Sequence, residues 1–208
     1  MRGLFFLASI VSVALSFGCS VEAGNDFSTS TAIVPDFEIS VGHAELKKLK
    51  SGEYLFRGLP LSGYLLEHDQ SGILRSRRGY FDGFLEGDYL LFYPSGDTAE
   101  WRNYSQGRKH GRHVGFHSNG NQKFEFFFDK GKAIGTHRQW YADGTSYMLE
   151  NYNDAGKPFG LQRVWRPDGK LRSNFVVKED GRSYGLVGLK RCTKIDSETK
   201  YIDPYEGS

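Results

Sequence analysis

Hydrophobic and polar residues alternate along most of this chain, in short runs bounded by turn residues. In the run from Thr136 to Tyr141, Trp140 falls on one face, and His137, Gln139 and Tyr141 fall on the other. A period of two predicts a β-strand with one face more buried than the other. No run of ten or more residues has a helical period, so the pattern predicts an all-β protein.

Each predicted strand is followed by a turn and a returning strand. Asp143-Gly144 ends the run above, and Asp-Gly is a strong signal for a β-hairpin. Similar turns lie at Pro94-Ser95-Gly96, Ser118-Asn119-Gly120 and Pro167-Asp168-Gly169. Because short connections place consecutive hairpins side by side, we expect an elongated antiparallel meander of about five to six hairpins.

The hairpins form a repeat of 24 or 25 residues, and its glycines mark the turns and strand starts. A fixed period of this length indicates a repeat array. The glycines that we assign to the repeat are Gly63, Gly83, Gly87, Gly107, Gly111, Gly131, Gly135 and Gly160.

Two columns of mainly aromatic residues follow the same period. The first, which we call the tyrosine column, is Phe56, Tyr80, Tyr104, Phe128, Tyr152 and Val177. The second, the tryptophan column, is His68, Phe92, Phe116, Trp140 and Trp165. A lone hairpin is marginal in water. We therefore expect Phe92, Phe116, Trp140 and Trp165 to stack along one face and hold the array together, at intervals of roughly two strand spacings, about 10 Å.

Composition and charge agree with this architecture. The chain has 26 Gly, 12 Tyr and 16 Phe in 208 residues, which is typical of many short strands joined by tight turns. Its 27 basic and 25 acidic residues nearly balance, so the chain lacks the basic footprint of a nucleic-acid-binding protein.

The N-terminus has the features of a secretory signal, which we place at residues 1–18. Met1-Arg2 is followed by an apolar run from Leu4 to Leu15 and then by Cys19, after Gly18. Cys19 resembles the lipidated cysteine of a bacterial lipobox, although Leu15 stands four residues before it instead of three. Either Cys19 carries lipid or an ordinary signal is cleaved and the cysteine is incidental. Residues 19–42 are polar and read as a flexible tether.

The repeat resembles the MORN type (membrane occupation and recognition nexus), and more closely its bacterial variant. The motif is an aromatic residue followed by a glycine three residues later and another four residues beyond, as in Tyr80 to Gly87 and Phe128 to Gly135. The resemblance covers about residues 53–188, with Phe56 to Gly63 as a degenerate first copy. It implies a hairpin array; the family is associated with membrane binding, scaffolding and, in many bacterial members, antitoxin components.

Candidate chemistry is sparse. The spacing of His110, His113 and His117 would suit a metal on a helix, but on a strand the Cα atoms of His113 and His117 are roughly 13 Å apart. We therefore expect no metal and no cofactor, and we interpret these histidines as residues of the polar face. No serine lies in a Gly-x-Ser-x-Gly elbow, and no phosphate-binding glycine loop is present. The sequence predicts a protein that is not an enzyme.

Cys192 lies beyond the array, among Lys190, Arg191 and Lys194, which favour its thiolate. If Cys19 carries lipid, Cys192 is the one free thiol of an exported protein. It is a candidate for an intermolecular disulfide, a redox contact or a soft-metal ligand, or else a small residue that ends the last strand.

These features predict a signal peptide (residues 1–18), a tether (19–42), hairpin repeats (43–188) and a C-terminal tail (189–208). The leading hypothesis is a lipoprotein of the bacterial cell envelope, periplasm-facing or at the cell surface, anchored to the membrane by its lipid. Its sheet would bind an envelope protein or the membrane surface. The alternatives are an antitoxin-like protein that neutralises a toxin, and an accessory to a redox or metal-delivery protein through Cys192.

Tyr and Arg are enriched at interfaces. The candidate binding residues are Tyr89, Tyr93, Arg102, Arg138, Tyr141, Tyr147 and Arg166.

Overall fold

The computed structural model describes residues 32–187, which form strands joined by turns and loops, without a helix. The signal peptide, Cys19, most of the tether, Cys192 and the tail lie outside the described residues. The strands of the long sheet are β1 (Glu38–Ser40), β5 (Gly63–His68), β6 (Leu74–Phe81), β7 (Phe84–Phe92), β8 (Thr98–Ser105), β9 (Arg108–Lys109), β10 (Gly111–Phe116), β11 (Gln122–Asp129), β12 (Lys132–Ala133), β13 (Gly135–Trp140), β14 (Ser146–Tyr152), β15 (Gly160–Trp165), β16 (Leu171–Val177) and β17 (Ser183–Leu186). A second sheet contains β2 (Leu46–Lys48), β3 (Tyr54–Phe56) and β4 (Leu59–Pro60).

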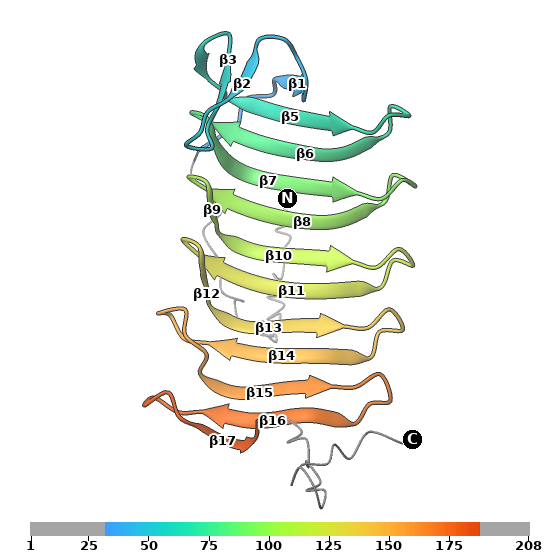
Figure 1. The fold of residues 1–208 in the computed structure, drawn as a ribbon, viewed down its shortest axis with the longest axis vertical. Helices are drawn as coiled ribbons and strands as arrows, with labels where there is room; N and C mark the ends of the chain where they lie inside the picture. The colour runs from blue at the N-terminus through green and yellow to red at the C-terminus, as the bar shows by residue number, and fades with distance from the viewer. Residues whose placement is uncertain (1–31, 188–208) are drawn as a thin grey trace, which may run out of the picture.

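The long sheet is the expected meander. From β5 to β17 each main strand pairs antiparallel with the next one along the chain, and the hairpins stack along one axis (Figure 1). Five full hairpins begin at β5, β7, β10, β13 and β15, and β17 starts a sixth. The prediction of an elongated all-β array of five to six hairpins is confirmed.

The turns on one edge of the sheet explain the spacing of the repeat. Asp82-Gly83, Gln106-Gly107 and Lys130-Gly131 each place two successive residues at positive φ, with values near 50° for the first residue and 73° to 88° for the glycine. Two positive φ angles define the type I′ turn, whose twist matches that of the strands it joins. Glycine tolerates this conformation because it has no Cβ, so the repeat keeps a glycine at the second position.

The register places the two aromatic columns on opposite faces. Gly111 pairs with Phe128, and His113 pairs with Phe126, so these residues share one face with the rest of the tyrosine column. We call this the histidine face. The tryptophan column follows the other alternation, because Leu91 of β7 shares the face of Tyr89 and Phe92 comes next. The side chains of the column from Phe92 to Trp165 are half-buried there.

The N-terminal end departs from the predicted boundaries. Glu38–Ser40, which we assigned to the tether, forms β1 and pairs in parallel with β5. Ile39 is buried there with Leu61, Leu65 and Tyr80, and this apolar cluster explains why the segment is not a free tether. The residues before Gly63 likewise form the small sheet instead of a full hairpin of the array. It packs on the same cluster and covers the first hairpin.

Gly79 provides a test of how closely β6 packs against the backbone of β7. A Cβ at position 79 would lie 2.3 Å from the carbonyl oxygen of Glu86, a backbone atom that moves only if the strand moves. We expect Gly79→Ala to lower the free energy of unfolding by about 2–3 kcal/mol. Gly96→Asn is the control, because position 96 has open space around it and Asn tolerates positive φ. Urea unfolding of both variants checks the prediction, and equal midpoints would contradict it.

Candidate functional site

At three junctions between successive hairpins, from β8 to β15, the strands pair over only a short length, and this leaves openings on the histidine face. Within the hairpin of β10 and β11, six residue pairs form the ladder, whereas β8 and β10 pair only at Val114 with Trp101 and at Gly115 with Glu100. The junctions of β11 with β13 and of β14 with β15 also have two pairs each. Each junction therefore opens towards the edge that carries the type I′ turns.

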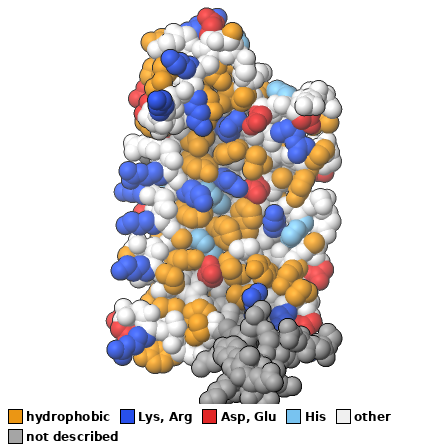
Figure 2. All heavy atoms as spheres, in the orientation of Figure 1, with side chains coloured by type: hydrophobic (Ala, Val, Ile, Leu, Met, Phe, Trp, Pro, Cys, Tyr) orange, Lys and Arg blue, Asp and Glu red, His pale blue; other side chains and the backbone are white. Residues whose placement is uncertain are grey.

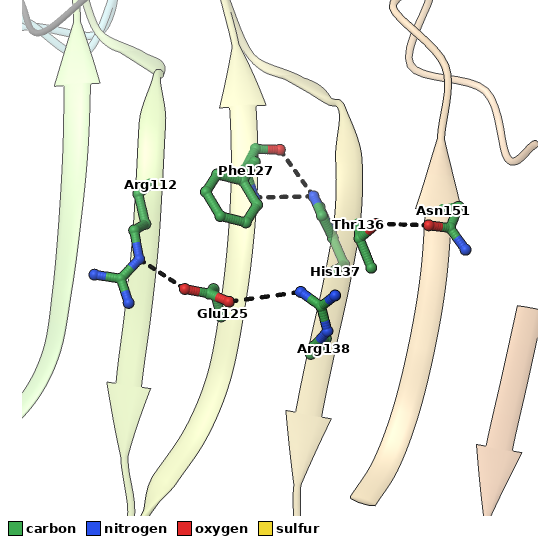
Figure 3. A network of polar contacts seen from close by, with 7 residues as sticks. All are labelled: Arg112, Glu125, Phe127, Thr136, His137, Arg138 and Asn151. Carbon is green, nitrogen blue, oxygen red and sulfur yellow. Dashed lines mark hydrogen bonds and ion pairs between the residues drawn. The ribbon is translucent and has the colours of Figure 1, made fainter. Parts of the chain in front are cut away.

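A polar side chain bridges each opening. His113 donates from Nε2 to the carbonyl oxygen of Asn103 at 2.7 Å. His137 Nε2 lies 2.8 Å from the carbonyl oxygen of Phe127 and 3.1 Å from its amide nitrogen (Figure 3). Gln162 makes the same connection with its amide, since Nε2 donates to the carbonyl of Asn151 at 2.8 Å. The bridging residue stands two positions after the opening glycine and reaches the strand end of the preceding hairpin.

The two histidines also join the tyrosine column into a continuous row of rings. Their imidazoles alternate with the column residues, so that each lies between two aromatic rings from successive hairpins. The ring centroids are 5.6 Å apart for Tyr104–His113, 4.7 Å for His113–Phe128, 5.3 Å for Phe128–His137 and 4.7 Å for His137–Tyr152. We call this row the ring ladder. Such contacts add stability beyond the area they bury.

Burial sets the protonation of the ladder histidines. His113 and His137 are 2% and 5% exposed. Burial lowers the pKa of His113 to about 4, against the opposing effect of the hydrogen bond to Asn103. It also lowers the pKa of His137. Both imidazoles are therefore neutral at pH 7, when each donates one ring hydrogen to a carbonyl.

The histidines thus have a structural environment that the sequence interpretation missed. We expected side chains on a polar face, but His113 and His137 lie buried between aromatic rings. Among residues 32–187, no three His, Cys, Asp or Glu side chains come together as a possible metal site. The sequence does carry the signal: His, His and Gln recur two residues after Gly111, Gly135 and Gly160.

Two of the candidate binding residues tie neighbouring hairpins together. The hydroxyl of Tyr93 donates to the carbonyl of Phe116 at 2.8 Å, and that of Tyr141 donates to the carbonyl of Trp165 at 2.9 Å. His117 makes the equivalent contact to the carbonyl of Trp140. These residues follow the tryptophan column in sequence and connect each hairpin to the next one.

The remaining candidates are divided among different parts of the sheet. Tyr89 and Arg102 are paired on the histidine face, where Arg102 also contacts Glu100. Arg138 lies on the opposite face, in the row of ion pairs Arg112–Glu125–Arg138 (Figure 3). Tyr147 packs on Tyr141 with ring centroids 5.1 Å apart. Arg166 is half-buried at the first position of a turn. The structure therefore does not gather the seven candidates into one patch.

An aromatic platform lies in the middle of the histidine face. The rings of Phe124 and Phe126 stack with centroids 4.7 Å apart and an angle of 15°, and Phe126 stacks in turn on His137 at 4.9 Å. A Cβ at Gly115 would lie 2.2 Å from the Phe124 ring, so this glycine makes room for it. The other hairpins have a side chain at that position, such as Leu91. Figure 2 shows hydrophobic side chains along the middle of the visible face and Lys and Arg side chains along its left edge.

A cleft with both polar and apolar lining lies at the N-terminal end of the same face, where the small sheet meets the long one. Its volume is about 310 Å³. It is lined by Lys48, Ser51, Gly52, Tyr54, Arg78, Tyr80, Phe84, Leu85, Tyr89 and Gly107. We call it the junction cleft. Larger hollows, of about 430 Å³ beside Asp82 and Glu86 and about 490 Å³ beside Val176 and Glu179, have acidic side chains in their linings.

Comparisons with models of protein families and with curated protein sequences find no match for this chain. Within residues 32–187 the structure has no helix that is both long and apolar enough to cross a bilayer.

Proposed function

We propose that this protein is a non-enzymatic, lipid-anchored scaffold of the cell envelope, and that it binds a partner protein through the histidine face of its sheet. The observation that carries the proposal is the aromatic platform of Phe124 and Phe126. Both rings are half-buried on a face that no second layer covers within the described residues. Flat aromatic side chains in a partly apolar surface are typical of the centre of a protein interface.

The platform is special to one hairpin, which favours a binding role. The hairpins on either side have Arg102 and Glu150 at the position of Phe126, and Glu100 and Met148 at the position of Phe124. Side chains that hold the array together recur in most units, as the residues of the tyrosine column do. Phe124 and Phe126 break that regularity, and Gly115 accommodates one of them.

The buried polar groups support a non-enzymatic role. His113 and His137 bridge hairpins through backbone groups. Each of these groups has a backbone partner that fixes its position. A general acid or base needs instead a free route to a reacting group.

The binding face can be tested by site-specific photocrosslinking in membranes of the native host. A photoreactive residue in place of Phe126 probes the histidine face, and one in place of Leu149, a half-buried strand residue of the other face, is the matched control. We expect a defined crosslinked protein from position 126, lost when Phe124 is changed to Ser, and none from position 149. Equal crosslinking from both positions would contradict the proposal.

The anchor needs a separate test. We expect labelled palmitate to be incorporated into the native chain and not into a Cys19→Ser variant, with the native protein recovered in the membrane fraction. If Cys19 is not acylated and the protein stays in the cytoplasm, the envelope role is wrong and the antitoxin-like role becomes the better hypothesis.

A further inference from the structure

The junction cleft brings together hydrogen-bond donors from two sheets. Lys48 and Tyr54 are paired on the side of the small sheet that faces the apolar cluster. Arg78 and Tyr89 are paired across β6 and β7 on the histidine face, and Tyr80 follows on the same face. These five side chains line one cleft because the small sheet packs over the first hairpin.

The cleft contains one buried donor that is unpaired within the described residues, on Arg78. The hydroxyls of Tyr54, Tyr80 and Tyr89 add further donors to the lining. The Nε of Arg78 is buried and lacks a hydrogen-bond partner among residues 32–187, although the other end of the guanidinium pairs with Glu67 at 2.9 Å. A buried donor without a partner is unfavourable, so a site of this kind favours an acceptor from outside.

The lining carries positive charge and flat apolar walls. Lys48 Nζ lies 5.5 Å from the centroid of the Tyr54 ring, and Arg78 lies 5.7 Å from that of Tyr89. None of the lining residues is an Asp or Glu. Burial raises the pKa of Tyr80 to about 12 and raises that of Tyr89, so both hydroxyls keep their hydrogen at neutral pH.

We propose that the junction cleft binds a small ligand that carries an anionic oxygen group, phosphate or carboxylate, on a flat ring. The anionic group accepts from Arg78, Lys48 and the tyrosine hydroxyls, all of which are donors. The ring packs against the tyrosine rings and Leu85. A volume of about 310 Å³ falls at the small end of the range for ligand sites. This site is separate from the aromatic platform, so its function does not depend on the scaffold role.

The test measures binding of phenyl phosphate to the full chain by calorimetry, with benzoate, inorganic phosphate and phenol as comparison probes. We expect phenyl phosphate or benzoate to bind more tightly than either the anion alone or the ring alone. Tyr89→Phe removes one hydroxyl and keeps the ring, and we expect it to weaken this binding by about tenfold, as does Arg78→Gln.

The neighbouring residues supply matched controls. Arg77 and Tyr64 form a second arginine–tyrosine pair, 3.3 Å from guanidinium carbon to ring centroid, on the opposite face of the same hairpin. Lys47 precedes Lys48 on the other side of its strand. Arg77→Gln, Tyr64→Phe and Lys47→Gln should leave the affinity unchanged, whereas Lys48→Gln should lower it.

Three results would overturn the proposal: absence of binding, equal affinity for phenol, or equal weakening by the Arg77 and Arg78 variants. Binding to vesicles of phosphatidylglycerol that is sensitive to the cleft variants, without binding of phenyl phosphate or benzoate, would identify a lipid headgroup as the source of the anion and would also reject a soluble ligand. Unfolding midpoints of all variants show whether the fold is retained, and Tyr89→Phe keeps the test independent of the Arg78–Glu67 ion pair.

Discussion

Acidification from pH 7 to pH 4.5 is expected to destabilise the hairpin array, before most carboxylates take up a proton. Burial lowers the pKa of His113 to about 4 and also lowers that of His137, whereas an unfolded histidine has a pKa of about 6.5. As the pH falls below about 6.5, these two histidines therefore take up protons in the unfolded chain but stay neutral in the folded chain. The stability contributed by these neutral imidazoles is present above the unfolded pKa and is lost as the pH falls towards the folded one.

The expected loss is large for a single side chain. The pKa of His113 falls from about 6.5 in the unfolded chain to about 4 in the folded chain. This difference lowers the free energy of unfolding by about 3 kcal/mol by the time the pH reaches 4. Lys109 and Arg102 oppose protonation of His113, and Glu150 favours protonation of His137. Urea unfolding at pH 7, 5.5 and 4.5 measures the effect. The double variant His113→Gln/His137→Gln should flatten the profile, and an unchanged slope in that variant would assign the loss to other groups.

The architecture could be predicted from the sequence because its signals are local and repeated. A turn glycine and a period-two pattern determine each hairpin within 24 or 25 residues, and the pattern recurs along the chain. The tyrosine column could be identified for the same reason. The small sheet could not, because β2, β3 and β4 are two or three residues long and their pairing depends on the apolar cluster around Leu61 and Leu65.

The roles of individual side chains were harder to predict. Alternation places His113 and His137 on a face, but whether that face is polar depends on which rings lie across the junction. The incomplete ladder between β8 and β10 is a property of the paired strands and leaves no mark in either strand alone. Likewise, Tyr93 and Tyr141 have the composition of an interface, but their hydroxyls bind carbonyls one unit further along the chain. The junction cleft combines residues from Lys48 to Gly107, so its donors are dispersed in the sequence.

His137→Ala is expected to lower the free energy of unfolding by about 3 kcal/mol. The substitution removes a buried ring from between Phe128 and Tyr152 and leaves a cavity. It also removes the bridge to the backbone of Phe127, whose amide and carbonyl both lie within hydrogen-bond distance of Nε2. Because the units of a repeat array contact mainly their neighbours, the damage should be greatest at the junction of β11 and β13.

The array itself supplies the control for this prediction. Gln162 occupies the equivalent position one hairpin later and bonds both the amide and the carbonyl of Asn151. His137→Gln should therefore keep the bridge and lose only ring packing, at a cost of about 1 kcal/mol. His117→Ala, which removes a half-buried imidazole bound to the carbonyl of Trp140, should also cost about 1 kcal/mol. Urea unfolding ranks the three variants, and amide exchange at Phe127 locates the opening. If His137→Gln is as unstable as His137→Ala, the backbone bridge contributes little, and ring packing alone holds this junction together.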